Sequence, residues 1–184
     1  MEERYDASAS STLFGSSLGG LFVLYALFQH PDAFDAFISV SPALWWDDQL
    51  LLRQEDDLAA SQEDVEATLF LAVGSEEERA DIPTLAPFRM VSNVRTFAER
   101  LAARGYPSLD LATYVAEGES HTTVVPVALT RGLRYIHRVR PSAGTGVPRV
   151  RRRGRSIRMD LRDRHDRADP TPVSDRRPPG RSLS

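Results

Sequence analysis

The feature that most constrains this chain is a turn of glycine and serine set between two apolar segments. Residues 11–15, STLFG, have the short apolar character of a buried strand that ends in glycine. Residues 18–29, LGGLFVLYALFQ, are apolar almost all round and are followed by His30 and Pro31, which predicts a helix buried against a sheet. Residues 34–42 predict a second buried strand. Strand, helix and strand within about 30 residues have the size of one βαβ unit.

The same alternation continues along the chain to about residue 137. The sequence predicts helices at residues 47–60, 87–104 and about 122–137, and strands at residues 67–74 and 109–116. An aspartate at position 47 can cap the first of these helices. We therefore expect an α/β fold with a parallel sheet and helices on both faces.

Composition divides the chain into two unlike parts, residues 1–137 and residues 138–184. The first carries 9 Arg and 21 acidic residues, whereas the second carries 14 Arg and 5 Asp and has almost no aliphatic periodicity. The second part is rich in Arg, Pro, Gly and Ser, so we predict a basic, disordered tail after an α/β domain. A nucleic-acid-binding arm is the alternative for residues 149–158, RVRRRGRSIR. The tail has no aromatic residues for stacking, which disfavours a nucleic-acid partner.

The composition also excludes several kinds of chemistry and predicts a location. The chain has no cysteine, which excludes disulfides, thiolate metal sites and cysteine nucleophiles. We expect no metal and no cofactor. No apolar run approaches the ~18 residues that span a bilayer, and the first residues lack the pattern of a signal peptide. These features predict a cytoplasmic protein.

Residues 15–19, GSSLG, match the G-x-S-x-G pattern of a nucleophile elbow, in which a serine lies on a sharp strand-to-helix turn. Small residues two positions away on either side relieve crowding in that turn. An ordinary glycine-rich turn is the alternative, but the apolar strand before the motif and the apolar helix after it favour the elbow. We predict Ser17 as nucleophile and the Leu18 backbone N–H as a donor to the oxyanion.

A serine hydroxyl is a weak nucleophile, so it needs an imidazole to take its proton and a carboxylate to orient that imidazole. In the fold that carries this serine motif, the chain order is serine, then acid, then histidine. His121 lies in a short polar loop after the last predicted strand, which is the position of the base in that order. The remaining histidines are predicted at a helix end, on the last helix and in the tail: His30, His137 and His165. We predict His121 as the general base.

The acid is expected after the third predicted strand, where residues 75–79 read SEEER. Glu77 is favoured among three neighbouring glutamates. The other candidates are Glu76, Glu78, Asp81 and Glu119. The alternative is that this acidic cluster is a solvated turn with no catalytic role. Some hydrolases with a serine nucleophile work with only the serine and the histidine, so the prediction of Ser17 and His121 does not require an acid.

Four segments between residues 3 and 137 resemble the esterase D and siderophore-esterase group of α/β-hydrolases, in the same order and spacing. They are LFGSSLGGLFVLYALFQHPDAFDAFISVSPALWWDD, LFLAVGSEEER, MVSNVRTFAERL and EGESHTTVVPVALTRGLRYI. The resemblance implies a carboxylic-ester hydrolase acting on siderophore or other small esters. It matches Ser17 to the nucleophile, His121 to the base and Glu77 to an acidic position.

The resemblance also matches Trp45 and Trp46 to an aromatic pair, which implies one side of the substrate pocket, with core packing as the alternative. The chain departs from the group because it lacks the strands that precede the elbow and the second oxyanion donor. A truncated, inactive hydrolase-like protein is therefore the alternative to an active esterase. We expect an exposed sheet edge, covered by a second copy or a partner chain.

Overall fold

The computed structural model describes residues 10–61 and 63–138, which form alternating strands and helices. In chain order the elements are β1 (Thr12–Ser16), α1 (Leu18–Gln29), β2 (Ala36–Val40), α2 (Trp46–Ser61), β3 (Ala67–Gly74), the 3₁₀ helices η1 (Ser75–Glu78) and η2 (Ala86–Phe88), α3 (Met90–Arg104), β4 (Leu109–Ala116) and α4 (Val124–Ile136). The predicted alternation is confirmed.

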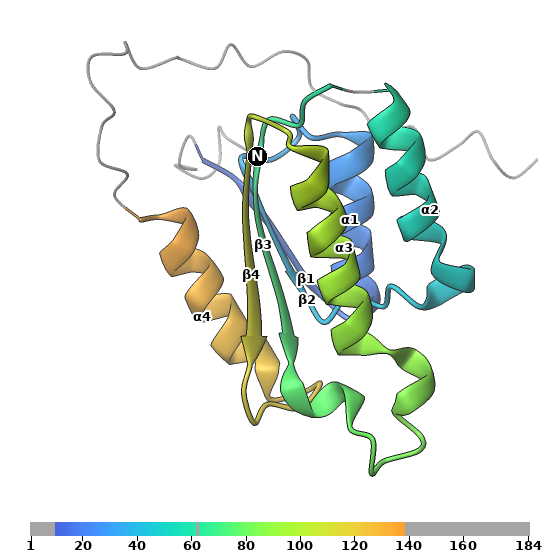
Figure 1. The fold of residues 1–184 in the computed structure, drawn as a ribbon. Helices are drawn as coiled ribbons and strands as arrows, with labels where there is room; N and C mark the ends of the chain where they lie inside the picture. The colour runs from blue at the N-terminus through green and yellow to red at the C-terminus, as the bar shows by residue number, and fades with distance from the viewer. Residues whose placement is uncertain (1–9, 62, 139–184) are drawn as a thin grey trace, which may run out of the picture. The chain divides into compact units, whose positions relative to one another are not determined.

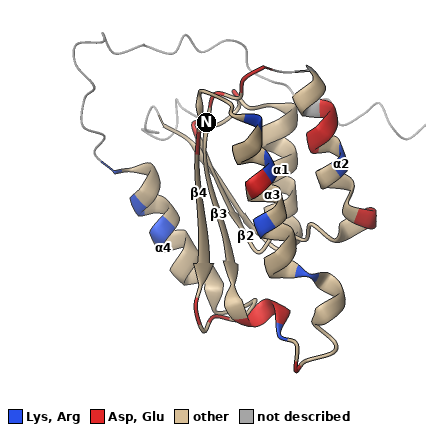
Figure 2. Cartoon of the chain, in the orientation of Figure 1, with Lys and Arg blue, Asp and Glu red and all other residues tan. Residues whose placement is uncertain are grey.

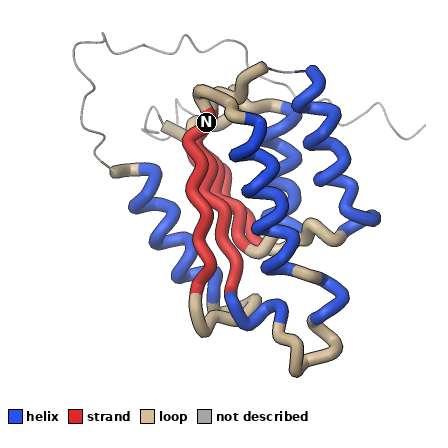
Figure 3. Tube along the Cα trace, in the orientation of Figure 1, coloured by secondary structure: helices blue, strands red, loops and turns tan. Residues whose placement is uncertain are grey.

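The four strands form one parallel sheet in the order β1-β2-β3-β4. Helices α1, α2 and α3 lie on one face, and α4 lies on the other (Figures 1 and 3). This arrangement confirms the predicted α/β class with helices on both faces. Because all four strands run in the same direction, their carboxyl ends meet at one end of the sheet, where the loops carry the candidate site residues.

Two apolar layers hold the helices against the sheet. The larger layer packs the sheet against α1, α2 and α3, around Leu24, Phe37 and Phe97, and the smaller packs it against α4, around Ile38 and Phe70. All five residues of β2 are buried, as expected for a central strand of a parallel sheet. The layers fix the sheet from both sides and so fix the loops at its carboxyl end.

Two helix predictions were wrong at their starts. Asp47 does not cap α2, because residues 47–49 have φ between 48° and 60° and form a left-handed turn. Arg53 donates hydrogen bonds to the carbonyls of Asp47 and Asp48, which holds this turn. The predicted helix at 87–104 is divided at Arg89, whose φ is 47°, into the short η2 and the longer α3.

Arg138, the first residue of the predicted tail, lies within the described part of the chain. Arg138 forms an ion pair with Asp110 at 2.8 Å and stacks over the ring of Tyr135 at 3.6 Å. The rest of the predicted tail lies outside the described residues. No helix within residues 10–61 or 63–138 is long and apolar enough to cross a membrane.

Candidate active site

Ser17 occupies the turn between β1 and α1 in a backbone conformation that residues other than glycine rarely adopt. Its φ is 57° and its ψ is −120°. Its N–H donates to the carbonyl of Val40 at 3.0 Å, and its own carbonyl accepts from Leu21 at 3.0 Å and Ala43 at 3.1 Å. These bonds hold a partly exposed serine at the carboxyl end of the sheet, on a strained strand-to-helix turn.

The two outer glycines of the motif differ in their surroundings. A Cβ on Gly15 would lie 2.2 Å from the carbonyl oxygen of Gly19, whereas a Cβ on Gly19 would meet nothing within 4 Å. The turn therefore closes because Gly15 has no side chain, and the prediction that both positions relieve crowding is correct for Gly15 alone.

Glu77 and His121 are brought together by the loops after β3 and β4. The Nδ1 of His121 lies 2.5 Å from Glu77 Oε2. The other carboxylate oxygen, Oε1, accepts from the Gly74 N–H at 2.7 Å and from the Ser41 hydroxyl at 2.5 Å. Three donors thus satisfy a carboxylate that is buried. The carboxylate partner on Nδ1 places the proton on that nitrogen, which leaves Nε2 with a lone pair.

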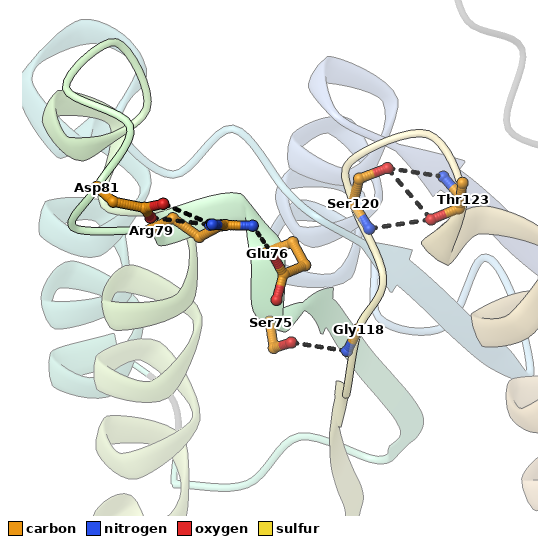
Figure 4. A network of polar contacts seen from close by, with 7 residues as sticks. All are labelled: Ser75, Glu76, Arg79, Asp81, Gly118, Ser120 and Thr123. Carbon is orange, nitrogen blue, oxygen red and sulfur yellow. Dashed lines mark hydrogen bonds and ion pairs between the residues drawn. The ribbon is translucent and has the colours of Figure 1, made fainter.

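The other candidate acids have different side-chain partners in the described part of the chain. Glu76 and Asp81 both pair with Arg79, at 2.7 Å and 2.5 Å (Figure 4). Arg79 lowers the pKa of Asp81, and the two carboxylates raise the pKa of Arg79 above its usual range. Glu78 accepts hydrogen bonds from the backbone and side chain of Ser92 in α3.

Glu119 contributes its backbone, because its carbonyl accepts from the Glu76 N–H at 3.1 Å. The Gly118 N–H donates to the Ser75 hydroxyl at 2.9 Å, which joins the same two loops a second time (Figure 4). A Cβ on Gly74 would lie 2.1 Å from the Glu119 carbonyl oxygen, so the loops pack directly on each other there. The loop that carries His121 is therefore fixed on the segment that carries Glu77.

The serine lies two strands away from the acid in the sheet order. No hydrogen bond joins the Ser17 hydroxyl to His121 within the described residues, although both lie at the carboxyl end of the sheet.

Leu18 begins α1, and the first N–H groups of a helix have no partner inside that helix. Figure 2 shows acidic residues on η1, directly after β3, and on the loop after β4.

The two tryptophans differ in exposure. Trp45 is half-buried and packs on the larger apolar layer, whereas Trp46 is 48% exposed. Phe88, which the sequence predicts as an apolar position of the helix at 87–104 and not as part of the site, lies with its ring 5.0 Å from that of Trp45. The predicted pair is thus part of a three-ring aromatic cluster that begins in the core and ends at the surface.

Ser41 is the residue of this region that the sequence analysis did not assign to the site. It lies in the turn after β2 with a φ of 44°, and its side chain is buried against Glu77. The one signal in the sequence is its place before Pro42 at the end of a strand. Within residues 10–61 and 63–138, no group of three or more His, Asp or Glu side chains is placed to hold a metal ion.

Comparison with known proteins gives matches to esterases. The model of the Esterase family, described as “Putative esterase”, matches residues 1–123. The chain is 34% identical over 126 residues to the ferri-bacillibactin esterase BesA of Bacillus subtilis (strain 168), covering 67% of this chain and 42% of BesA.

Two solved structures support the same relationship. The siderophore hydrolase EstA from Aspergillus nidulans has a TM-score of 0.63 at 28% identity, over 70% of this chain and 48% of EstA. The BES protein from Bacillus cereus has a TM-score of 0.57 at 38% identity, over 68% of this chain and 44% of that protein. The chain spans less than half the length of each of these relatives. Because the family model matches more than half of the sequence, and the sheet and helices match those of α/β-hydrolases, this chain belongs to the Esterase family.

Proposed function

We propose that this chain carries the catalytic residues of a serine esterase that hydrolyses small carboxylic esters through an acyl-enzyme intermediate. The observation that carries the proposal is the hydrogen bond between Glu77 and His121 at the end of the sheet where Ser17 lies on its strained turn. A buried carboxylate on Nδ1, together with an Nε2 that has no hydrogen bond to another described residue, is the arrangement that a serine nucleophile needs from its base.

In the proposed mechanism Ser17 Oγ attacks the carbonyl carbon of the ester while His121 Nε2 takes the hydroxyl proton. Glu77 stabilises the imidazolium that forms, through the Nδ1–H bond. The Leu18 N–H donates to the developing oxyanion. The C–O bond to the alcohol then breaks, and His121 returns its proton to the leaving oxygen. A water activated by the same imidazole hydrolyses the acyl-enzyme and regenerates the serine.

We propose small siderophore-like esters as the substrate class, because one relative is named a ferri-bacillibactin esterase and another a siderophore hydrolase. The cluster of Trp45, Trp46 and Phe88 supports this, since exposed aromatic rings provide flat apolar surface for the acyl or alcohol part of a planar ester.

The test is covalent labelling with a fluorophosphonate probe, read by intact mass and peptide mapping. The label should appear on Ser17 and vanish in Ser17→Ala. Glu77→Ala should label roughly 10²- to 10⁴-fold more slowly, because the imidazole loses its orienting carboxylate. Glu76→Ala is the matched control and should label at nearly the wild-type rate, since Glu76 pairs with Arg79 instead. A folded, unlabelled wild-type protein would favour the inactive hydrolase-like alternative.

We also propose that another polypeptide surface covers the β1 side of the molecule. Leu18, Phe22 and Tyr25, which follow the helical spacing i, i+4 and i+7 on α1, are 53%, 50% and 44% exposed. Phe14 of β1 is 38% exposed, and β1 pairs with β2 alone within the described sheet. A strand that is paired along one edge within the described sheet, beside an exposed apolar helix face, is a surface on which a second copy or a partner chain packs favourably.

A further inference from the structure

We propose that Ser41 is a positioning residue, which holds the Glu77 carboxylate in the orientation that serves His121. Its catalytic consequence rests on the proposed function above. The geometric claim stands apart from that function, because it concerns the hydrogen bond between Glu77 and His121 itself.

The hydrogen bonds of the carboxylate divide between its two oxygens. Glu77 Oε1 accepts from the Ser41 hydroxyl and the Gly74 N–H, and Oε2 contacts His121. Because Oε1 is held by one donor from the turn after β2 and one from the end of β3, rotation of the carboxylate about its last bond would break both of those bonds. The position of Oε2, and with it the orientation of the imidazole, is therefore set by the donors on Oε1. The hydroxyl is the side-chain donor among them, and it is the one that a substitution removes.

The backbone of Ser41 is shaped around this contact. A φ of 44° is unfavourable for serine, and a residue before proline prefers an extended conformation. The Ser41 N–H donates to the Ala72 carbonyl at 2.7 Å, which holds the strained residue against β3. Strain of this kind persists where the surrounding structure fixes it, and it concentrates at functional sites. Here it places a fully buried hydroxyl 2.5 Å from a buried carboxylate oxygen.

Ser39, which lies two residues earlier in β2, provides a matched control. It is also fully buried, and its hydroxyl donates at 2.9 Å, but the acceptor is the backbone carbonyl of Gly20 in α1. Ser39→Ala and Ser41→Ala each remove one buried hydroxyl and one hydrogen bond. A purely structural role would make their effects alike, whereas a positioning role separates them.

The first measurement is the rate of fluorophosphonate labelling at Ser17. Ser41→Ala should slow labelling about 10- to 100-fold, the range for losing a hydrogen bond to a charged group, while Ser39→Ala stays within about twofold of wild type. In the Glu77→Ala background, Ser41→Ala should cause no further loss, because its effect passes through the carboxylate. If Ser41→Ala fails to fold, Ser41→Cys keeps the size with a weaker donor and should give an intermediate rate.

The second measurement does not depend on reactivity and separates failure of this inference from failure of the proposed function. In the Ser17→Ala protein labelled with ¹⁵N-histidine, His121 should give a downfield Nδ1 proton that disappears in Glu77→Ala. Ser41→Ala should move or broaden this resonance and Ser39→Ala should leave it in place. Three results would overturn the positioning role. The first is an unchanged His121 resonance in Ser41→Ala, and the second is an equal loss of labelling rate in Ser41→Ala and Ser39→Ala. The third is that Ser41→Ala slows labelling as much in the Glu77→Ala background as in the wild type.

Discussion

Three consecutive glutamates after β3 have three different partners: Glu76 contacts Arg79, Glu77 contacts His121 and Glu78 contacts Ser92. The reason is the 3₁₀ helix η1, in which three residues complete one turn, so that neighbouring side chains point in directions about 120° apart. One short turn thus supplies the candidate acid, a surface ion pair and a bond to α3.

The glycine motif gives a prediction at the same scale. Gly15→Ala should destabilise the protein strongly and abolish labelling at Ser17, because the added Cβ would lie 2.2 Å from the Gly19 carbonyl oxygen and would open the turn. Gly19→Ala should leave the free energy of unfolding unchanged or raise it by up to about 1 kcal/mol, since alanine favours a helix. Urea denaturation of both variants checks this, and equal destabilisation would contradict it.

Some residues of the candidate site could be predicted from the sequence and others could not, and the difference has a physical reason. The nucleophile motif and a histidine after the last strand are local patterns, so Ser17 and His121 could be proposed without a structure. Glu77 remained one of several acids, because the direction of each side chain depends on the turn that β3 and the β4 loop impose. The Ser41 contact joins residues 36 positions apart, and no local pattern marks it.

At the scale of elements, Glu78 connects the acid-carrying turn to α3. Its carboxylate accepts from the Ser92 N–H at 2.6 Å, within the first turn of α3, where no intrahelical acceptor exists. Glu78→Ala should therefore lower the free energy of unfolding by about 1 kcal/mol, as loss of a helix cap does. Glu76→Ala, which breaks a surface ion pair, should cost less than about 0.5 kcal/mol. Thermal unfolding compares the two, and a larger loss in Glu76→Ala would contradict the capping role.

The strands at 67–74 and 109–116 have the bounds that the sequence predicts, because the preference for extended backbone runs through both segments. The helix prediction at 87–104 failed at its start because the apolar periodicity includes Phe88. The Phe88 ring packs on Trp45 and is 38% exposed, and Arg89 then turns the chain before α3 begins. Periodicity identifies apolar residues but not which apolar surface they contact.

At the scale of the whole molecule, the exposed side of α1 predicts association. The purified 20.5 kDa chain should sediment partly as a species larger than a monomer at micromolar concentration, and a Phe22→Ser/Tyr25→Ser variant should shift it toward the monomer. Leu133→Ser is the control, because Leu133 is 39% exposed on α4, on the other face of the sheet. A wild-type protein that stays monomeric at every concentration would contradict self-association.

Backbone hydrogen bonds extend the sheet beyond its strands into the turns that carry the candidate site residues. These bonds determine how those turns unfold on heating. Ser17 donates to Val40, Ser41 to Ala72, and Glu76 to Glu119, so the turn after each of the first three strands is bonded to the next strand or its loop. Segments bonded in this way open together with the elements that they contact. The site should therefore melt cooperatively with the sheet, and a partly unfolded form that keeps the sheet should keep these turns in place.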